Sequence, residues 1–445
     1  MLKKTISNRV NLLFKQTIVN LNTEIMTSRF VALPVKEGDA FLLNRNGTVV
    51  LVDGGKGKII KKLLREHGQL KDDVLDIVVC THNDLDHLGG ILKILNSDTF
   101  VIKELRVPSI WKEICIYIGD TEESKRNFCK IIVNVIRDHV IRGDIQSDNL
   151  KQFAEEILSD PYGMENRYDN YHENRKYDDE VFKNNEDLLV GYTYEMVFNS
   201  SVQAPAFMSK LVWSLIDRGL FSISREQNIL CLSLLNAMTA AVKNIWCIVT
   251  IAARKRIRVN YYIHDNRVSI STAGKSFLVP VNARKISARD IMAKIVMKKF
   301  KGEESKSISV MVTLAKSVSN RESIAFYAVE TKTEPGVLFC AECGVEPQGL
   351  SPLRTILATV PHHGASDNQS VYQDVERWAM RNVVWVRSDS KNTVRPCDEF
   401  LKLRSKKYCT RCNVNGFYEQ IIEFVSNIDW VDTAAVPCVC ISRKK

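Results

Sequence analysis

Residues Thr81–Gly90, THNDLDHLGG, are the most informative segment of this chain for its fold. It directly follows Val74–Cys80, VLDIVVC, a mostly apolar run that is typical of a buried strand. Neutral imidazole suits Zn²⁺, and carboxylates also suit Mn²⁺ or Mg²⁺. Side chains of these two kinds occupy four of six consecutive positions in the loop: His82, Asp84, Asp86 and His87. The spacing predicts two ion sites, with the first two side chains facing one ion and the last two facing the other.

Two further segments supply the rest of a metal site. Thr48–Val52 is a short apolar strand that runs into Asp53–Gly55, and VPHHGA at residues 360–365 adds the neighbouring pair His362 and His363. A polar helix N-terminus would explain the first loop alone, but not a second histidine-rich loop and an acidic turn. We therefore expect an α/β domain whose loops carry chemistry at the ends of its strands.

These segments carry a resemblance to a known family. VVLVDGG at residues 49–55, THNDLDHLGG and VPHHGA together resemble metallo-β-lactamase-fold hydrolases, and within them the hydrolase domain of the ComEC competence protein and its stand-alone relatives. Gly38–Asp39–Ala40 matches an early turn typical of that subgroup. The resemblance covers about residues 28–110 and 320–400. It implies an α/β fold, an αββα sandwich, with two divalent metal ions (Zn or Mn) at one edge.

The resemblance also assigns roles to single residues. Asp53 is expected to orient the metal loop and its ligands from beneath. Either His362 or His363 is expected to complete the second metal site. The subgroup has an Asp that bridges both metals, and Glu342 stands at the matching place, one methylene longer. Cys340 or Cys343 is the alternative ligand there.

A second departure from the subgroup lies at residues 392–396, NTVRP. The subgroup has a His before this Pro, whereas this chain has Arg395. A guanidinium does not bind metal, but it can hold a phosphate through two parallel hydrogen bonds. Together with nearby Lys391, Arg395 is therefore expected to stabilise a charged transition state.

The predicted function is that of a metal-dependent hydrolase, a phosphodiesterase or nuclease acting on nucleic acid through a water activated by two metals. Asp84 or Asp86 is expected to accept the proton of that water. One alternative is hydrolysis of a cyclic nucleotide or another small phosphodiester, with the helical insertion excluding polymers. Another is a catalytically weak or inactive interaction module of a multiprotein bacterial system, because Glu342 and Arg395 depart from the subgroup.

The 445 residues divide into one fold enlarged by an insertion. Residues 1–27 form an N-terminal extension, 28–110 the first part of the fold, 111–225 a mostly helical insertion and 226–445 the second part. The insertion contains helical patterns at Phe128–His139 and Leu150–Leu158 and a polar loop at Asn166–Asp187. Protein partners, if any, are expected on the insertion or the extension.

The remaining elements follow from apolar periodicity. A long helix is predicted from Glu226 to about Lys255. Strands are predicted at Phe30–Leu43 (a pair broken at Lys36–Asp39), Ile257–Ile263, Ile308–Leu314, Ser323–Val329, Gly336–Cys340, Leu353–Thr359 and Asn382–Val386.

Composition excludes global disorder, because 45% of the residues are hydrophobic and 26% are charged. The longest apolar stretch without charge, Asn244–Ala253, is too short to span a membrane, so a cytoplasmic location is expected. Lys and Arg outnumber Asp and Glu by 62 to 52, a net charge of +10 that suits a nucleic acid or nucleotide substrate. Basic clusters at 254–258, 294–301 and 402–407 are either phosphate contacts or solvated helix ends.

Twelve cysteines are scattered along the chain. The pair Cys409 and Cys412 is spaced C-x-x-C, and Cys438 and Cys440 follow after 25 intervening residues. Two such pairs can form a structural zinc site. Buried free thiols near two strands are the alternative.

Overall fold

The computed structural model describes most of the chain. The described residues are 28–57, 59–141, 179–198, 225–270, 276–300, 306–319, 322–342, 344–389, 395–412, 419–426 and 428–440. The predicted N-terminal extension, the helix at Leu150–Leu158 and most of the polar loop lie outside them.

The larger sheet follows the predicted order of strands in the first part of the chain. In the described residues it has nine strands in the order β15-β14-β1-β2-β3-β4-β5-β6-β8. Strands β3 to β6 run parallel, and those at either side are antiparallel. The strand bounds are β1 Ser28–Ala32, β2 Phe41–Arg45, β3 Thr48–Val52, β4 Val74–Val79, β5 Val101–Pro108, β6 Arg258–His264, β8 Ala283–Ile286, β14 Ile422–Ser426 and β15 Trp430–Asp432.

The smaller sheet comes from the second half of the chain. Its six described strands have the order β13-β12-β11-β10-β9-β7, with β10 to β13 parallel. Their bounds are β7 Leu278–Pro280, β9 Phe326–Ala328, β10 Val337–Phe339, β11 Ile356–Thr359, β12 Val383–Arg387 and β13 Lys407–Cys409.

The two sheets face each other across one apolar layer. Phe30 and Phe41 of the larger sheet lie 6.2 and 6.3 Å from Phe339 of the smaller one, measured between ring centroids. Alternate residues of each strand enter this layer because side chains in a strand point to opposite faces. Val50 and Val52, for example, belong to the layer, whereas Val49 and Leu51 face the helices.

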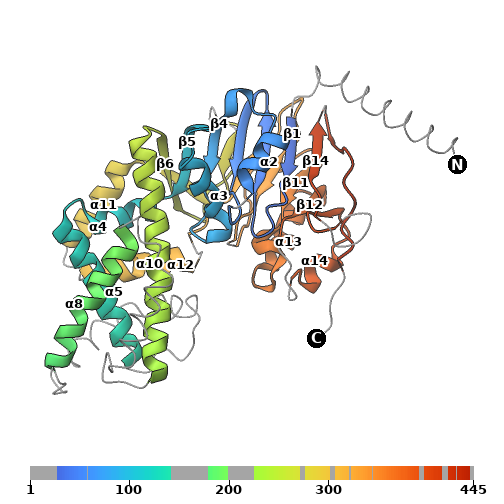
Figure 1. Ribbon diagram of the computed structural model, residues 1–445. Helices are drawn as coiled ribbons and strands as arrows, with labels where there is room; N and C mark the ends of the chain where they lie inside the picture. Colours follow the sequence, from blue (N-terminus) through green and yellow to red (C-terminus); the bar gives the residue numbers. More distant parts are fainter. Residues whose placement is uncertain are drawn as a thin grey trace, which may run out of the picture.

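Helices cover the outer faces of both sheets. The larger sheet is covered by α2 (Ile60–His67) and α3 (Leu85–Leu95), and the smaller one by α13 (Ser370–Trp378) and α14 (Asp398–Lys402). Figure 1 shows α2 and α3 over the blue strands and α13 and α14 on the opposite side. The layers are therefore those of the predicted αββα sandwich.

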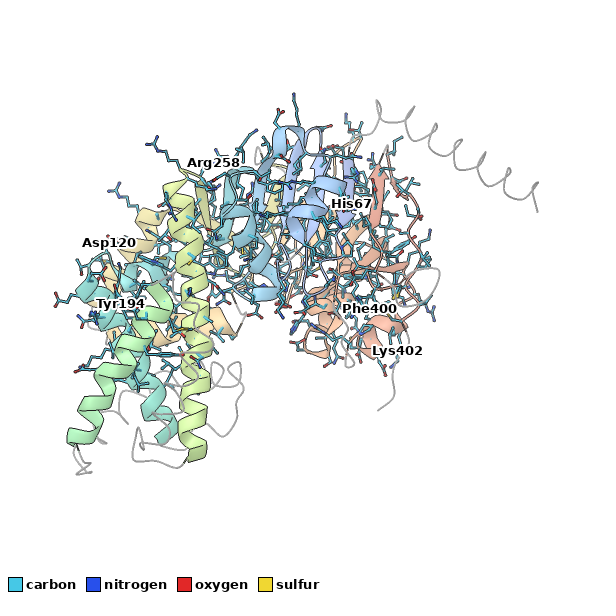
Figure 2. All side chains as sticks on the ribbon, in the orientation of Figure 1. His67, Asp120, Tyr194, Arg258, Phe400 and Lys402 are labelled. Carbon is cyan, nitrogen blue, oxygen red and sulfur yellow. The ribbon has the colours of Figure 1, made fainter. Side chains whose placement is uncertain are left out.

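A group of longer helices lies at one end of the sandwich (Figure 1). They are α4 Ile110–Ile118, α5 Glu122–Ile141, α8 Asp179–Phe198, α10 Arg225–Arg254, α11 Ala288–Phe300 and α12 Lys306–Val318. In Figure 2, Asp120 and Tyr194 mark this helical end, and Phe400 and Lys402 mark the opposite end. The helical part thus combines the predicted insertion with three later helices.

The strand predicted at Ile308–Leu314 was wrong, because these residues belong to helix α12. Its β-branched residues favour a strand by propensity. The buried positions of this helix include Val310, Leu314 and Val318, which recur every four residues. Packing of that face against α4 and α5 decides the conformation.

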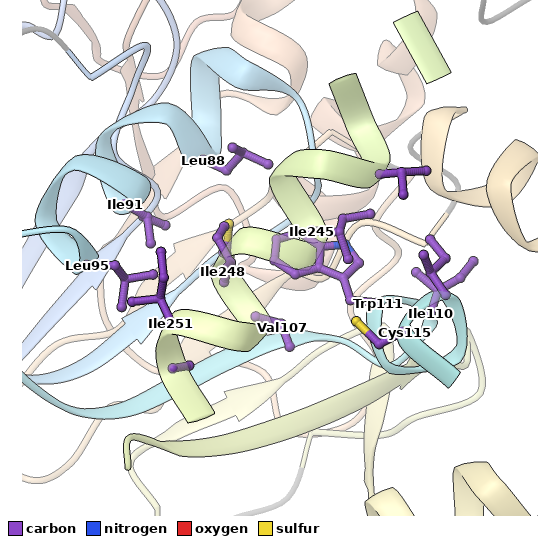
Figure 3. Packing of buried hydrophobic residues seen from close by; sticks show 14 of the residues in the cluster. Leu88, Ile91, Leu95, Val107, Ile110, Trp111, Cys115, Ile245, Ile248 and Ile251 are labelled. Carbon is purple, nitrogen blue, oxygen red and sulfur yellow. The ribbon is translucent and has the colours of Figure 1, made fainter. Parts of the chain in front are cut away.

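Helix α10 is the apolar centre of the helical part. Ile245, Ile248 and Ile251 are buried, and Figure 3 shows them beside Leu88 and Ile91 of α3. By length and composition alone, the stretch 234–254 is long and apolar enough to cross a membrane. It is longer than Asn244–Ala253, the stretch that the sequence analysis considered too short for a membrane span. In this fold its buried face packs against α3, α4, α5 and α8. The helical part is thereby fixed to α3, the helix whose first turn carries Asp86 and His87 of the metal loop.

Candidate metal centre

The acidic turn after β3 and the metal loop after β4 touch through their backbones. Gly54 N–H donates to the carbonyl of His87 at 2.7 Å, and Gly90 N–H donates to the carbonyl of Gly55 at 2.8 Å. A Cβ on Gly90 would lie 1.9 Å from the carbonyl oxygen of Gly54. Only glycine permits this approach, so the glycines of both motifs fix the distance between the loops.

The turn before β2 packs on the same loop. Gly38 has φ +88°, and a Cβ there would lie 1.5 Å from the carbonyl oxygen of Asp86. Asp39 N–H donates to that oxygen at 3.3 Å, and Gly55 N–H donates to the carbonyl of Asp39 at 2.7 Å. Three loops from three strand ends therefore meet at one edge of the sandwich.

Asp53 lies beneath these loops and holds two of them. Its carboxylate accepts hydrogen bonds from the N–H and the hydroxyl of Thr81 at 2.9 and 2.7 Å. The same carboxylate lies 2.9 Å from Nδ1 of His87. Burial lowers the pKa of His87, but the nearby carboxylates, Asp53 foremost, outweigh burial and hold this pKa well above its usual value. Asp53 therefore has the contacts expected of a residue that orients the loop and its ligands.

The first group of candidate metal ligands surrounds His82. Its Nε2 lies 3.4 Å from one oxygen of Glu342 and 3.8 Å from the carboxylate of Asp84. The Nε2 of His362 lies 3.8 Å from the same oxygen of Glu342. On the other side of the ring, Nδ1 of His82 lies 2.9 Å from the hydroxyl of Thr81, which fixes the ring orientation.

The second group surrounds His87. Its Nε2 lies 3.2 Å from Nε2 of His363, which in turn lies 3.4 Å from the carboxylate of Asp86. The Nδ1 of His363 lies 3.1 Å from the carboxylate of Asp39. Burial lowers the pKa of His363, but Asp39 and Asp86 raise it to about 10. Both histidines of the His-His pair thus lie at the centre, and His363 is the one beside the second group.

Glu342 lies between the two groups. One of its oxygens is 3.0 Å from Nε2 of His87 and 3.5 Å from Nε2 of His363, and the other faces His82. Burial raises the pKa of Glu342, but His82, His87 and other imidazoles outweigh burial and hold it well below the usual range. The extra methylene relative to aspartate does not prevent the carboxylate from facing both groups.

The backbone around the centre is strained. Asp53, Ala341, His362 and His363 have φ values of +58°, +58°, +45° and +53°. Non-glycine residues in this region carry an energetic cost and concentrate at functional sites. The neighbouring pair can place one imidazole in each group because both of its residues adopt this conformation.

The donor set fits divalent metal ions. His82, His87 and Glu342 present ligand atoms within 4.8 Å of one another, as do Asp39, His87 and His363. Among the described residues, nothing hydrogen-bonds to Nε2 of His82, although that atom is buried. Such a nitrogen is costly to leave unsatisfied, and coordination of a metal would satisfy it.

The alternative thiolate ligands are not at the centre as far as the described residues show. Cys340 is buried in the apolar cluster on the outer face of the smaller sheet, and its N–H donates to Thr359. Cys343 lies outside the described residues. The carboxylate of Glu342 therefore occupies the place between the two groups.

Arg395 is linked to the centre through an acidic neighbour. Its guanidinium lies 3.2 Å from the carboxylate of Asp389, which also pairs with the buried Arg387. Arg387 Nε donates to the carbonyl of His363 at 2.6 Å, and Ser388 O lies 3.2 Å from Nδ1 of the same histidine. Lys391, the other predicted cation, lies outside the described residues.

Sequence reasoning missed two residues of this site. Asp39 was noted only as part of a turn, yet it contacts His363. Arg387 ends strand β12 and contacts the backbone of the His-His turn. A charged residue that directly follows the apolar run of a core strand was the available signal for Arg387.

Three residues of the basic clusters make structural contacts. Arg258 pairs with Glu104, and Lys255 donates to the carbonyl of Ser97 at 2.8 Å. Lys407 donates to two carbonyls at the end of α14. Other members of the same clusters are exposed to solvent: Arg254, Arg256, Lys402, Arg404 and Lys406.

Comparison with known proteins agrees with this geometry. Residues 33–111 match the model of the metallo-beta-lactamase superfamily. The matched segment includes Asp53 and the whole loop from His82 to His87. The chain therefore has the metallo-β-lactamase fold, and the match indicates a metal-dependent hydrolase. No curated protein matches the chain.

Proposed function

We propose that this protein is a two-metal hydrolase that cleaves phosphodiester bonds, with nucleic acid as the substrate. The observation that carries the proposal is the position of Glu342, with one oxygen toward His82 and the other toward His87 and His363. A carboxylate shared by two groups of imidazoles is the arrangement that a pair of divalent ions requires.

The two groups define the expected ligands. His82, Asp84 and His362 would hold one ion, and Asp86, His87 and His363 the other, with Glu342 shared. Bound there, the ions would supply Lewis-acid activation of a water and neutralise charge on phosphate oxygens. Asp53 and Asp39 would keep Nδ1 of His87 and His363 protonated, so that each Nε2 points at the metal.

The two loop carboxylates, Asp84 and Asp86, are more exposed to solvent than the buried residues of the site. The side chains of Asp84 and Asp86 are each 34% exposed, whereas those of His87, His363 and Glu342 are at most 2% exposed. Solvent and substrate therefore reach these two aspartates. We assign proton acceptance from the attacking water to one of them.

Three features support a phosphodiester substrate. Arg395 lies 3.2 Å from the carboxylate of Asp389, next to Ser388, whose carbonyl contacts His363, and its guanidinium can hold a phosphate through two parallel hydrogen bonds. The Gly38–Asp39–Ala40 turn resembles the ComEC-type subgroup. The net charge of +10 favours association with a polyanion.

Arg258, Lys255 and Lys407 of the basic clusters are held in structural contacts, which favours a second candidate, a cyclic nucleotide or another small phosphodiester. Competition between cyclic nucleotides and labelled oligonucleotides for one activity distinguishes the two substrates. Preferential turnover of the small molecule would replace nucleic acid as the substrate.

The test of hydrolysis uses the full chain with Mn²⁺ or Zn²⁺ and labelled single- and double-stranded nucleic acid. Wild type is expected to cleave, His363→Ala is expected to lose cleavage, and His67→Ala is the control because His67 lies on α2, away from the centre. Absence of cleavage by wild type, or equal cleavage by His363→Ala, would refute the proposal. Failure of the protein to bind Mn²⁺, which thiolates bind poorly, would instead favour a non-catalytic interaction module.

A further inference from the structure

Four cysteines gather at the end of the smaller sheet, apart from the histidine centre. Cys409 ends strand β13, and Cys412 follows on the next turn. The C-terminal segment lies against this strand, because Cys438 N–H donates to the carbonyl of Lys407 at 2.7 Å. As a result the four Sγ atoms, including that of Cys440, all lie within 4.8 Å of one another.

The sulfur distances fit a metal better than disulfides. The Sγ of Cys412 lies 3.5 Å from that of Cys440 and 4.0 Å from that of Cys438. A disulfide would require about 2.05 Å. Tetrahedral zinc with Zn–S bonds of about 2.3 Å separates its sulfurs by about 3.8 Å. All four residues are free cysteines.

The charges around the cluster favour thiolates. Arg387 is buried, and its Nη1 donates to Sγ of Cys409 at 3.3 Å and lies 3.8 Å from Sγ of Cys440. Because Asp389 is shared with Arg395, one carboxylate cannot neutralise both guanidinium groups. Negatively charged sulfur supplies the missing counter-charge. The N–H of Arg411 also points to Sγ of Cys409, at 3.4 Å.

We propose that Cys409, Cys412, Cys438 and Cys440 bind a structural zinc ion. Four protein sulfurs close the coordination sphere and leave no open position for a substrate, which is typical of structural rather than catalytic zinc. The site joins the C-terminal segment to the end of β13.

The same geometry gives the zinc site a link to the histidine centre. Arg387 donates through Nη1 to Cys409 and through Nε to the carbonyl of His363. This guanidinium therefore holds the His-His turn against the cysteine cluster, and Arg387 is a positioning residue. This link rests on the proposed function, whereas the zinc site does not.

Cobalt substitution of the full-length reduced protein tests the zinc site. Tetrahedral Co²⁺ bound to sulfur has an intense sulfur-to-metal charge-transfer band that histidine and carboxylate ligands do not give. Wild type is expected to show this band, Cys412→Ser to weaken it because three thiolates remain, and Cys247→Ser to leave it unchanged, because Cys247 lies on α10. A wild type without the band, or a Cys412→Ser variant with an unchanged band, would overturn the proposal.

Two further measurements keep the test independent of folding and of hydrolysis. An organomercurial added to wild type is expected to release one zinc ion per chain as the thiols react, and failure to release zinc would count against the site. Arg387→Met is expected to keep the charge-transfer band but to weaken Mn²⁺ binding at the histidine centre about tenfold or more. Unchanged Mn²⁺ affinity in this variant would refute the link while leaving the zinc site intact.

Discussion

Replacement of Asp53 by Asn tests how the centre is organised. The carboxylate of Asp53 accepts two hydrogen bonds from Thr81 and lies 2.9 Å from Nδ1 of His87. In Asp53→Asn, an NH₂ group replaces one oxygen. If the remaining oxygen stays with the Thr81 N–H, the NH₂ faces Nδ1 of His87 and donates to it. The imidazole proton then moves to Nε2, the nitrogen that faces Glu342 and the metal.

The expected loss follows from this change of tautomer. Removing a partner that orients a metal-bound histidine typically costs 10–100-fold in metal affinity, which is about 1.4–2.7 kcal/mol. Mn²⁺ is the suitable probe because thiolates bind it poorly, so the cysteine cluster does not contribute. Free Mn²⁺ can be followed by its paramagnetic resonance signal during titration.

Asp76→Asn is the matched control for this experiment. Asp76 lies on β4, near the metal loop in sequence, and accepts a hydrogen bond from the N–H of Val49 at 2.8 Å. It also pairs with Lys103 but contacts no residue of the centre. The control is expected to bind Mn²⁺ as wild type does. An Asp53→Asn protein that is folded and binds Mn²⁺ with unchanged affinity would refute the role assigned to Asp53.

Three further predictions concern the fold and the centre. Phe339→Ala leaves a cavity in the apolar layer between the sheets, and it is expected to lower the free energy of unfolding, measured by urea denaturation, by about 3–5 kcal/mol. Gly90→Ala is expected to lower the melting temperature and the Mn²⁺ affinity, because a Cβ there would lie 1.9 Å from a carbonyl oxygen. The control is Gly191→Ala on α8, where a Cβ meets nothing within 4 Å, and it is expected to stabilise the protein by up to about 1 kcal/mol. Equal effects of the two substitutions would contradict the conclusion that the close approach of the loops requires glycine at residue 90. A chelator is expected to lower the melting temperature of wild type, because it removes bound metal. The chelator is expected to lower the melting temperature of Glu342→Gln less, because this variant has already lost the carboxylate shared by the two groups. Equal shifts of the melting temperature in both proteins would argue against Glu342 as a shared ligand.

The local pattern of apolar residues was sufficient to predict most strands of the sandwich and its long helix. The strand at Thr48–Val52 has the predicted bounds, and the strand pair around residues 36–39 and the long helix α10 lie where apolar periodicity placed them. The strands could be predicted because they are short apolar runs that are buried on both faces, and α10 because its buried residues recur with the period of a helix. Helix α12 was not predicted correctly, because its β-branched residues favour a strand and only packing against the surrounding helices selects the helical conformation.

Sequence alone was sufficient to predict the metal loop, the turn at Asp53 and the kinds of candidate ligand at the centre. These features are local, because neighbouring residues at a strand end stay neighbours in any fold that forms the strand. Only the tertiary structure decided that His362 and His363 divide between the two groups, that Asp39 orients His363, and that Arg387 joins the histidine centre to four cysteines. Those contacts join residues from different strands of both sheets. They exist because the packing of the two sheets brings the ends of β3, β4, β10, β11 and β12 to one edge, and local periodicity carries no information about that packing.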